Sequence, residues 1–155
     1  MVLLTYGEPE NHSLLEHYRY SLSILRRLTL RIARIPRFLI PAIAMIRAWN
    51  RVREWRSHGV VSPLEAISRG QAAALAKALG EEYEVRTAFE FRPPGLIEVV
   101  TELRQNPPSR LLMLPLYTID SDLTTGISKA DLMWETLRRG DLPCPVSQVS
   151  RFSED

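Results

Sequence analysis

Residues 83–117 read YEVRTAFEFRPPGLIEVVTELRQNPPSRLLMLPLY and contain three segments that differ in hydrophobic pattern. Residues 83–91 have the composition of a strand and residues 111–117 that of a buried strand, whereas residues 95–105 repeat apolar side chains at helical spacing. Parallel strands need a long crossover, and a helix between two strands supplies one. We therefore expect a strand, a helix and a second strand, with the helix packed against a parallel sheet.

The rest of the chain continues this alternation. Ser62, Pro63 and Glu65 form a helix start signal, with a serine cap, a proline in the first turn and a glutamate that completes a capping box. Further elements are expected as strands over 2–6 and 146–152, and as helices over 13–27 (capped by Asn11), 41–58 (ended by Gly59), 62–80 and 130–139. The pattern predicts an α/β fold: a single domain over residues 1–155 with a three-layer, doubly wound, mostly parallel sheet.

Composition and charge exclude several classes of protein. The formal net charge of +2 is too small for a general binder of polyanions, and we expect no nucleic acid as a partner. The single cysteine, Cys144, excludes an intramolecular disulfide and a metal site made of four cysteines. No glycine-rich phosphate-binding motif occurs, which disfavours nucleotide binding.

Two segments give information on where in the cell the protein acts. Residues 1–6 lack the basic start and long apolar stretch of a secretory signal, so we expect a cytoplasmic protein. Residues 35–49 are apolar but interrupted by Pro36, Pro41 and arginines, which leaves them too short to span a bilayer. With the arginines between 26 and 56 they form a basic amphipathic stretch. Its interpretation stays open between contact with a substrate or a membrane surface, core packing and a solvated helix face.

Candidate functional residues lie in the loops that follow the expected strands. In an open parallel sheet, ligands bind outside the carboxyl ends of the strands, and here these are the loops after Tyr6, Phe91 and Tyr117. The last of these loops is rich in hydroxyls and carboxylates. Its hydroxyl residues either contact a ligand or cap the following helix, and they are Ser121, Thr124 and Thr125.

Three segments, in the same order, resemble the ferrochelatase family. Residues 3–10, LLTYGEPE, are similar to the family's opening L-L-x-x-G-x-P-E. Residues 47–71, which contain RA at 47–48, WRS at 55–57, GVVSPL at 59–64 and Gln71, resemble the family's R-A...Y-R-S-I-G-G-G-S-P-L...Q, with Trp55 in place of the tyrosine and Val60 and Val61 in place of two glycines. Residues 114–128 resemble L-P-L-Y-P-Q-Y-S-x-S-T-T-G-x-S. Between them, residues 88–103 resemble the family's A-M-R-Y-G-P-P segment and its following helix. Together the matches cover nearly the whole chain.

The resemblance implies a chelatase-like N-terminal domain from a class II chelatase of heme biosynthesis, with porphyrin and Fe²⁺ as substrates and no cofactor held by covalent or cluster ligation. The family's catalytic histidine and glutamate lie in a second domain that is absent here, so no catalytic residue is expected in this chain. Whether the chain is an enzyme stays open. It is either part of a ferrochelatase, inactive alone and joined by a second chelatase half or a homo-oligomer, or a non-catalytic tetrapyrrole-binding protein.

The resemblance also implies roles for individual residues. Tyr6 matches the position that packs against the macrocycle, and Tyr117 matches a tyrosine beside the catalytic centre. Arg47 and Ser62 match groups that hold a porphyrin propionate, a pairing that charge-assisted hydrogen bonds explain. The expected porphyrin-binding residues are Tyr6, Arg47, Trp55, Ser62, Phe91, Tyr117, Ser121, Thr124 and Thr125. The metal-binding residues are unknown.

Several positions depart from the family's pattern. Glu90 and Phe91 stand where an arginine and a tyrosine are usual, so this wall has one cation fewer and one anion more. Asp122 stands where some members have a cysteine, and with Cys144 alone no iron–sulfur cluster is expected. No histidine matches the family's catalytic motif. Each histidine is expected to be a solvated surface residue, and these are His12, His17 and His58.

Overall fold

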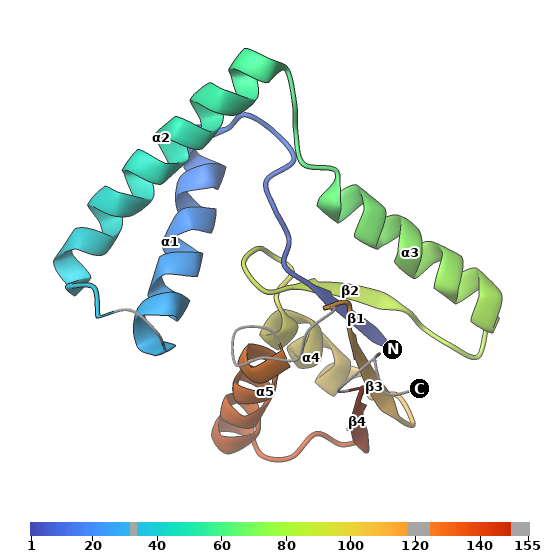
Figure 1. The fold of residues 1–155 in the computed structure, drawn as a ribbon. Coiled ribbons are helices and arrows are strands. Elements are labelled where there is room, and N and C mark those ends of the chain that lie inside the picture. The colour runs from blue at the N-terminus through green and yellow to red at the C-terminus, as the bar shows by residue number, and fades with distance from the viewer. Residues whose placement is uncertain (32–33, 118–124, 150–155) are drawn as a thin grey trace, which may run out of the picture. The chain divides into compact units, whose positions relative to one another are not determined.

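The computed structural model describes residues 1–31, 34–117 and 125–149 (Figure 1). By their contacts the residues divide into two compact units. We call Met1–Tyr6 with Ala66–Asp155 the sheet unit, and Gly7–Glu65 the hairpin unit.

The sheet unit contains four strands, all paired in parallel. These are β1 (Val2–Thr5), β2 (Arg86–Phe89), β3 (Leu111–Pro115) and β4 (Val146–Gln148), in the spatial order β2-β1-β3-β4. Strand β1 lies in the middle, because Val2 pairs with Arg86 on one side and with Met113 on the other. The expected parallel sheet is confirmed.

Three helices connect the strands: α3 (Leu64–Leu79), α4 (Leu96–Gln105) and α5 (Thr125–Arg139). The steps from β1 to β2 and from β2 to β3 run in opposite directions across the sheet, so right-handed crossovers place α3 and α4 on opposite faces. The step to β4 continues in the second direction, and α5 accordingly packs beside α4 (Figure 1). This is the doubly wound α/β arrangement that the sequence predicts.

The main core lies between the sheet and α4. Strand residues alternate between the faces of a sheet, and α4 presents an apolar face at helical spacing. The buried residues of this core are Val2, Leu4, Ala88, Leu96, Val99, Val100, Leu103, Leu111 and Met113. Leu3 and Phe89 are also fully buried, which explains why β1 is apolar at consecutive positions: both faces of the sheet are covered.

The hairpin unit consists of α1 (Leu14–Arg31), a short 3-10 turn (Arg37–Leu39) and α2 (Ile40–His58), with α1 packed on α2. Leu25, Ile40 and Ala44 form its small buried core. Core packing accounts for part of the 35–49 segment, because Ala44 and Ala48 are buried, whereas Phe38, Ile46 and Trp49 are exposed. No helix among the described residues is long and apolar enough to cross a membrane.

Several element boundaries differ from expectation. Ser13, not Asn11, caps α1: the Ser13 Oγ accepts the Glu16 N–H at 3.5 Å, while Asn11 Oδ1 accepts the Ser13 N–H at 2.8 Å. β2 is shorter than 83–91, and α5 begins before residue 130, at Thr125. The end of the expected strand 146–152 lies outside the described residues.

The helix ends at Gly59 and Gly80 are confirmed. Both glycines take the left-handed backbone conformation, with φ of 64° and 84°, which residues with a side chain rarely adopt.

Candidate functional site

An aromatic cluster lies at the carboxyl edge of the sheet. Tyr6 follows β1, Phe91 follows β2 and Tyr117 follows β3, and because β1 is central, Tyr6 lies between the other two. The ring centroids of Tyr6 and Phe91 are 5.7 Å apart with planes 4° from parallel, and those of Tyr6 and Tyr117 are 4.8 Å apart at 50°. We call these three side chains the aromatic shelf. Their meeting at this edge is what the sequence predicts for loops after parallel strands.

Tyr6 is the accessible member of the shelf. Its side chain is 37% exposed, whereas Tyr117 is 8% exposed. The backbone fixes its position, since the Phe91 N–H donates to the Tyr6 carbonyl at 3.1 Å. Burial raises the pKa of the Tyr6 phenol above its ordinary value, and the negative charge of Glu90 raises this pKa further. The shelf therefore presents a flat ring with a protonated hydroxyl, which can donate a hydrogen bond but is a poor base.

Glu90, the residue before Phe91, is a buried glutamate. It is 6% exposed, and its backbone N–H donates to the Thr5 carbonyl at 2.9 Å, which ties it to β1. Its Oε1 accepts the hydroxyl of Ser128, a fully buried residue in the first turn of α5, at 2.6 Å. Ser128 was not among the predicted site residues, and Glu90 was noted only as a departure from the family's pattern.

The other predicted residues of the strand loops are only partly described. Thr125 is the first residue of α5 and is 3% exposed, and its hydroxyl has no hydrogen-bond partner within the described part of the chain. Ser121 and Thr124 lie outside the described residues.

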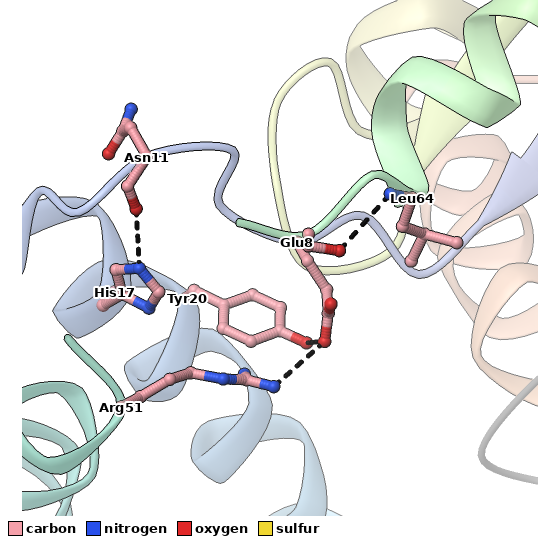
Figure 2. A network of polar contacts seen from close by, with 7 residues as sticks. Glu8, Asn11, His17, Tyr20, Arg51 and Leu64 are labelled. Atoms are coloured by element: carbon pink, nitrogen blue, oxygen red, sulfur yellow. Dashed lines mark hydrogen bonds and ion pairs between the residues drawn. The ribbon is translucent and has the colours of Figure 1, made fainter. Parts of the chain in front are cut away.

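The hairpin unit contains a separate polar network around Arg51 (Figure 2). An Arg51 guanidinium nitrogen lies 3.1 Å from Glu8 Oε1, and the Tyr20 hydroxyl donates to the same oxygen at 3.3 Å. The guanidinium also stacks over the rings of Tyr20 and Trp55, at 5.4 and 5.3 Å. Burial raises the pKa of Tyr20, and the charge of Glu8 raises this pKa further. Arg51 is thus fixed by an anion and two rings, although the sequence placed it only in a general basic stretch.

His17 contradicts the expectation of a solvated surface histidine. Its side chain is fully buried, its Nε2 donates to the Asn11 carbonyl at 2.8 Å, and its ring meets Trp55 edge-on at 4.8 Å. Burial lowers the pKa of His17 below its ordinary value. The reason is helix packing: position 17 lies on the face of α1 that meets α2. His58 is exposed as expected, and His12 is half-buried with its Nε2 2.9 Å from the Val60 carbonyl.

The three predicted porphyrin-binding residues of the hairpin unit differ in their surroundings. Arg47 is exposed on α2 and has no hydrogen bond or ion pair with another described residue. Ser62 is buried, and its Oγ accepts the Leu64 N–H at 3.3 Å at the start of α3. This bond leaves the hydroxyl free to donate, as the predicted contact with a propionate requires. Trp55 is half-buried beneath Arg51.

No group of three or more histidine, cysteine, aspartate and glutamate side chains that could hold a metal ion occurs among residues 1–31, 34–117 and 125–149. Cys144 is a free, half-buried thiol.

Comparison with known proteins identifies relatives of the whole chain. The ferrochelatase family model matches residues 1–155. A ferrochelatase of Geobacter metallireducens is 31% identical over 98% of this chain and 48% of its own length. A ferrochelatase of a Synechococcus strain is 31% identical over 86% of the chain and 41% of its own length, and one of Neisseria meningitidis is 35% identical over 65% of the chain. The chain thus spans about half the length of the curated relatives it matches.

Proposed function

Because the chain belongs to the ferrochelatase family, we propose that it forms the porphyrin-binding domain of an enzyme that inserts Fe²⁺ into a porphyrin in heme biosynthesis. The observation that carries this proposal is the aromatic shelf. An exposed tyrosine held between two further rings, at the carboxyl edge of a parallel sheet, offers a flat apolar surface to a flat apolar macrocycle.

The proposal assigns roles to the predicted porphyrin-binding residues. Tyr6 packs against the macrocycle, and its ring is supported by contacts with Phe91 and Tyr117. Arg47 and Ser62 hold a propionate, since a guanidinium and a hydroxyl both donate to a carboxylate. Support for the anchor is that Arg47 is exposed and Ser62 retains its donor. The hydroxyl-bearing residues 121, 124 and 125 complete the proposed contacts.

We further propose that the chain alone does not insert metal. Loss of the pyrrole protons needs a base that titrates near neutrality. The Tyr6 phenol is unsuited because its pKa is raised, and the His17 ring is unsuited because it is fully buried against Trp55. In this proposal a second chelatase half or a homo-oligomer supplies the base. The alternative is a protein that binds a tetrapyrrole without metallating it.

Two assays on the purified chain test this function. Titration with mesoporphyrin, followed by porphyrin absorbance, should give saturable binding of micromolar or weaker affinity, because a single wall buries little of the ligand. Insertion of Zn²⁺ or Fe²⁺ into the same porphyrin should be undetectable. Absence of saturable binding contradicts the porphyrin site, and rapid insertion by the chain alone contradicts the need for a partner.

The propionate anchor has its own test. Arg47→Ala should weaken binding of a free-acid porphyrin by roughly 1.5–3 kcal/mol if the guanidinium holds a carboxylate. Arg53→Ala, which removes another exposed arginine of α2, is the matched control and should bind as the parent chain does. A porphyrin with esterified propionates should be insensitive to Arg47→Ala. Equal losses in both variants would show a general charge effect and no anchor.

Membrane contact through residues 35–49 belongs to the same proposal, with the protein acting in the cytoplasm. Its support is the exposed apolar surface of Phe38, Ile46 and Trp49, which are 79%, 61% and 60% exposed, beside the arginines of this segment. Sedimentation with anionic vesicles should recover the chain, and a Phe38→Ser/Ile46→Ser variant should stay in solution. Equal recovery of both would contradict this contact.

A further inference from the structure

A pocket lies in the hairpin unit between the C-terminal half of α1 and the start of α2. Its volume is about 350 Å³, and its lining comes from α1, the 3-10 turn and α2: Leu22, Arg26, Thr29, Arg37, Ile40 and Pro41. Apart from the two arginines and the threonine, these side chains are apolar, and none is acidic. The pocket therefore combines apolar walls with two cations.

The two arginines of this pocket have no partner in the part of the chain that the structure describes. Arg26 and Arg37 are both exposed, and neither forms a hydrogen bond or an ion pair with another described residue. A guanidinium stays protonated in proteins, so both carry a positive charge. Arg51 of the same unit is instead paired with Glu8. Two like charges on one pocket repel each other, and an anion bound between them removes this repulsion.

The other polar groups of the lining are occupied or lack a donor. The Thr29 hydroxyl donates to the Leu25 carbonyl at 2.7 Å. The backbone N–H of Ile40 donates to the Arg37 carbonyl, and Pro41 has no N–H. The guanidinium groups are therefore the side-chain donors that the pocket offers to a ligand. Their paired N–H groups match the oxygens of a phosphate or a carboxylate.

The surroundings of the pocket indicate which anion it takes. Residues 17–53 contain nine arginines and no aspartate or glutamate, which favours an anionic partner. Phe38 and Leu39 directly follow Arg37 and are 79% and 40% exposed, and no residue of the 3-10 turn is buried. Exposed apolar side chains beside arginines suit the boundary of a membrane, where phosphate groups border hydrocarbon. A small soluble anion would leave these apolar side chains in water.

We infer that the pocket lined by Arg26 and Arg37 binds the phosphate of an anionic phospholipid. The inference rests on the proposed membrane contact of residues 35–49 and names the lipid group that this contact recognises. The two guanidinium groups hold the phosphate, and Phe38 enters the hydrocarbon boundary beside it. Arg26 lies on α1, so the site needs a residue from outside the 35–49 segment.

Two double variants of the full chain test this site. Arg26→Ala/Arg37→Ala removes the two pocket cations, whereas Arg19→Ala/Arg53→Ala removes two exposed arginines of the same unit that do not line the pocket. Sedimentation with vesicles of equal parts phosphatidylcholine and phosphatidylglycerol measures the binding of each. General attraction to an anionic surface depends on the number of charges and should weaken both variants equally. Loss of a phosphate site should weaken the pocket variant by about tenfold more.

A soluble lipid tests the same pocket without a membrane surface. Dihexanoyl phosphatidylglycerol, kept below its micelle concentration, should bind saturably to the parent chain and to Arg19→Ala/Arg53→Ala in isothermal titration calorimetry, and not to Arg26→Ala/Arg37→Ala. Inorganic phosphate should bind more weakly than this lipid, because it gains no apolar contact. Equal binding of inorganic phosphate and lipid assigns the pocket to a soluble anion and overturns the lipid site.

The failure of this inference differs from the failure of the membrane contact on which it rests. Equal vesicle binding by the two folded double variants overturns the phosphate site and leaves the membrane contact standing. A parent chain that does not sediment with the vesicles overturns the membrane contact itself. Weaker mesoporphyrin binding by Arg26→Ala/Arg37→Ala, with unchanged vesicle binding, assigns the two arginines to substrate carboxylates and also overturns the inference.

Discussion

The aromatic shelf and the Arg51 network are built in different ways. Tyr6, Phe91 and Tyr117 each follow a strand, and the order β2-β1-β3 is enough to bring them together. The Arg51 network instead joins Glu8, Tyr20 and Trp55 through the packing of α1 on α2. A site made by sheet topology can be predicted from the order of the strands, whereas one made by helix packing depends on which helix faces meet.

The two regions also differ in charge. The aromatic shelf adjoins a buried acidic residue, Glu90, which directly precedes Phe91 in the chain. The hairpin unit carries a cation, Arg51, that is already paired with Glu8 and stacked on two rings. Arg51 is therefore occupied within the protein, while Arg47, four residues earlier on the same helix, is exposed. This difference favours Arg47 over Arg51 as a group that contacts a ligand.

The largest expected effect concerns the hydrophobic cores of the two units. Leu4→Ala removes a fully buried side chain from the core between the sheet and α4, and should lower the free energy of unfolding by about 3 kcal/mol. Leu25→Ala lies in the small core of the hairpin unit, which can relax more easily, and should cost less. Urea unfolding followed by circular dichroism measures both. A larger loss in Leu25→Ala would reverse the comparison, and Leu15→Ala, at an exposed position, is the neutral control.

A smaller effect is expected in the Arg51 network. Arg51→Ala should destabilise the protein by about 1–2 kcal/mol, because Glu8 loses its ion pair and two rings lose their stacked cation, although partial exposure of both ionic side chains weakens the pair. Tyr20→Phe removes one hydrogen bond and should cost about 1 kcal/mol or less. A double-mutant cycle with Glu8→Gln should show coupling to Arg51. Strict additivity would mean that the ion pair contributes nothing to stability.

The smallest effect is the pH dependence that His17 gives to stability. Its pKa is lowered in the folded protein, so the unfolded chain binds a proton more readily. The contribution of His17 to the free energy of unfolding is therefore fully present above the unfolded pKa of about 6.5. It is lost as the pH falls from there toward the folded pKa, by at most about 1.4 kcal/mol per pH unit.

Unfolding measured between pH 7 and pH 5 checks this sign. His17→Phe should flatten the pH dependence over that interval, because the proton taken up on unfolding is lost with the imidazole. His58→Gln replaces an exposed histidine and should leave the slope as it is in the parent chain. A slope that survives in His17→Phe would assign the pH dependence to other groups.

The sequence predicted the parts of the structure that depend on local pattern. The buried strands at 2–6 and 111–117, the helix ends at Gly59 and Gly80, and the meeting of three loops at one sheet edge were all predicted. The burial of His17 could not be predicted, because it depends on Trp55, 38 positions away on another helix. Its only sequence signal is that position 17 falls three residues before Tyr20 on the helical repeat, which places both on one face of α1.

The residues around Glu90 were missed for a related reason. A glutamate after a strand is ordinarily a solvated loop residue, whereas Glu90 is buried and accepts a hydrogen bond from Ser128, on a helix that begins 35 positions later in the chain. The departure of Glu90 from the family's usual arginine was the available signal. It indicated a change of residue type in this wall but not the hydrogen bond that Glu90 accepts from Ser128.

The central claim is that the aromatic shelf binds a porphyrin, and a matched pair of tyrosine variants tests it most directly. Tyr6→Ala removes the exposed ring of the shelf, whereas Tyr83→Ala removes a tyrosine that is 51% exposed before the opposite end of β2. Mesoporphyrin binding, measured by absorbance in folded variants, should weaken at least tenfold in Tyr6→Ala, because an aromatic stacking surface is lost, and should be unchanged in Tyr83→Ala. Equal affinity in the parent chain and both variants would contradict the account.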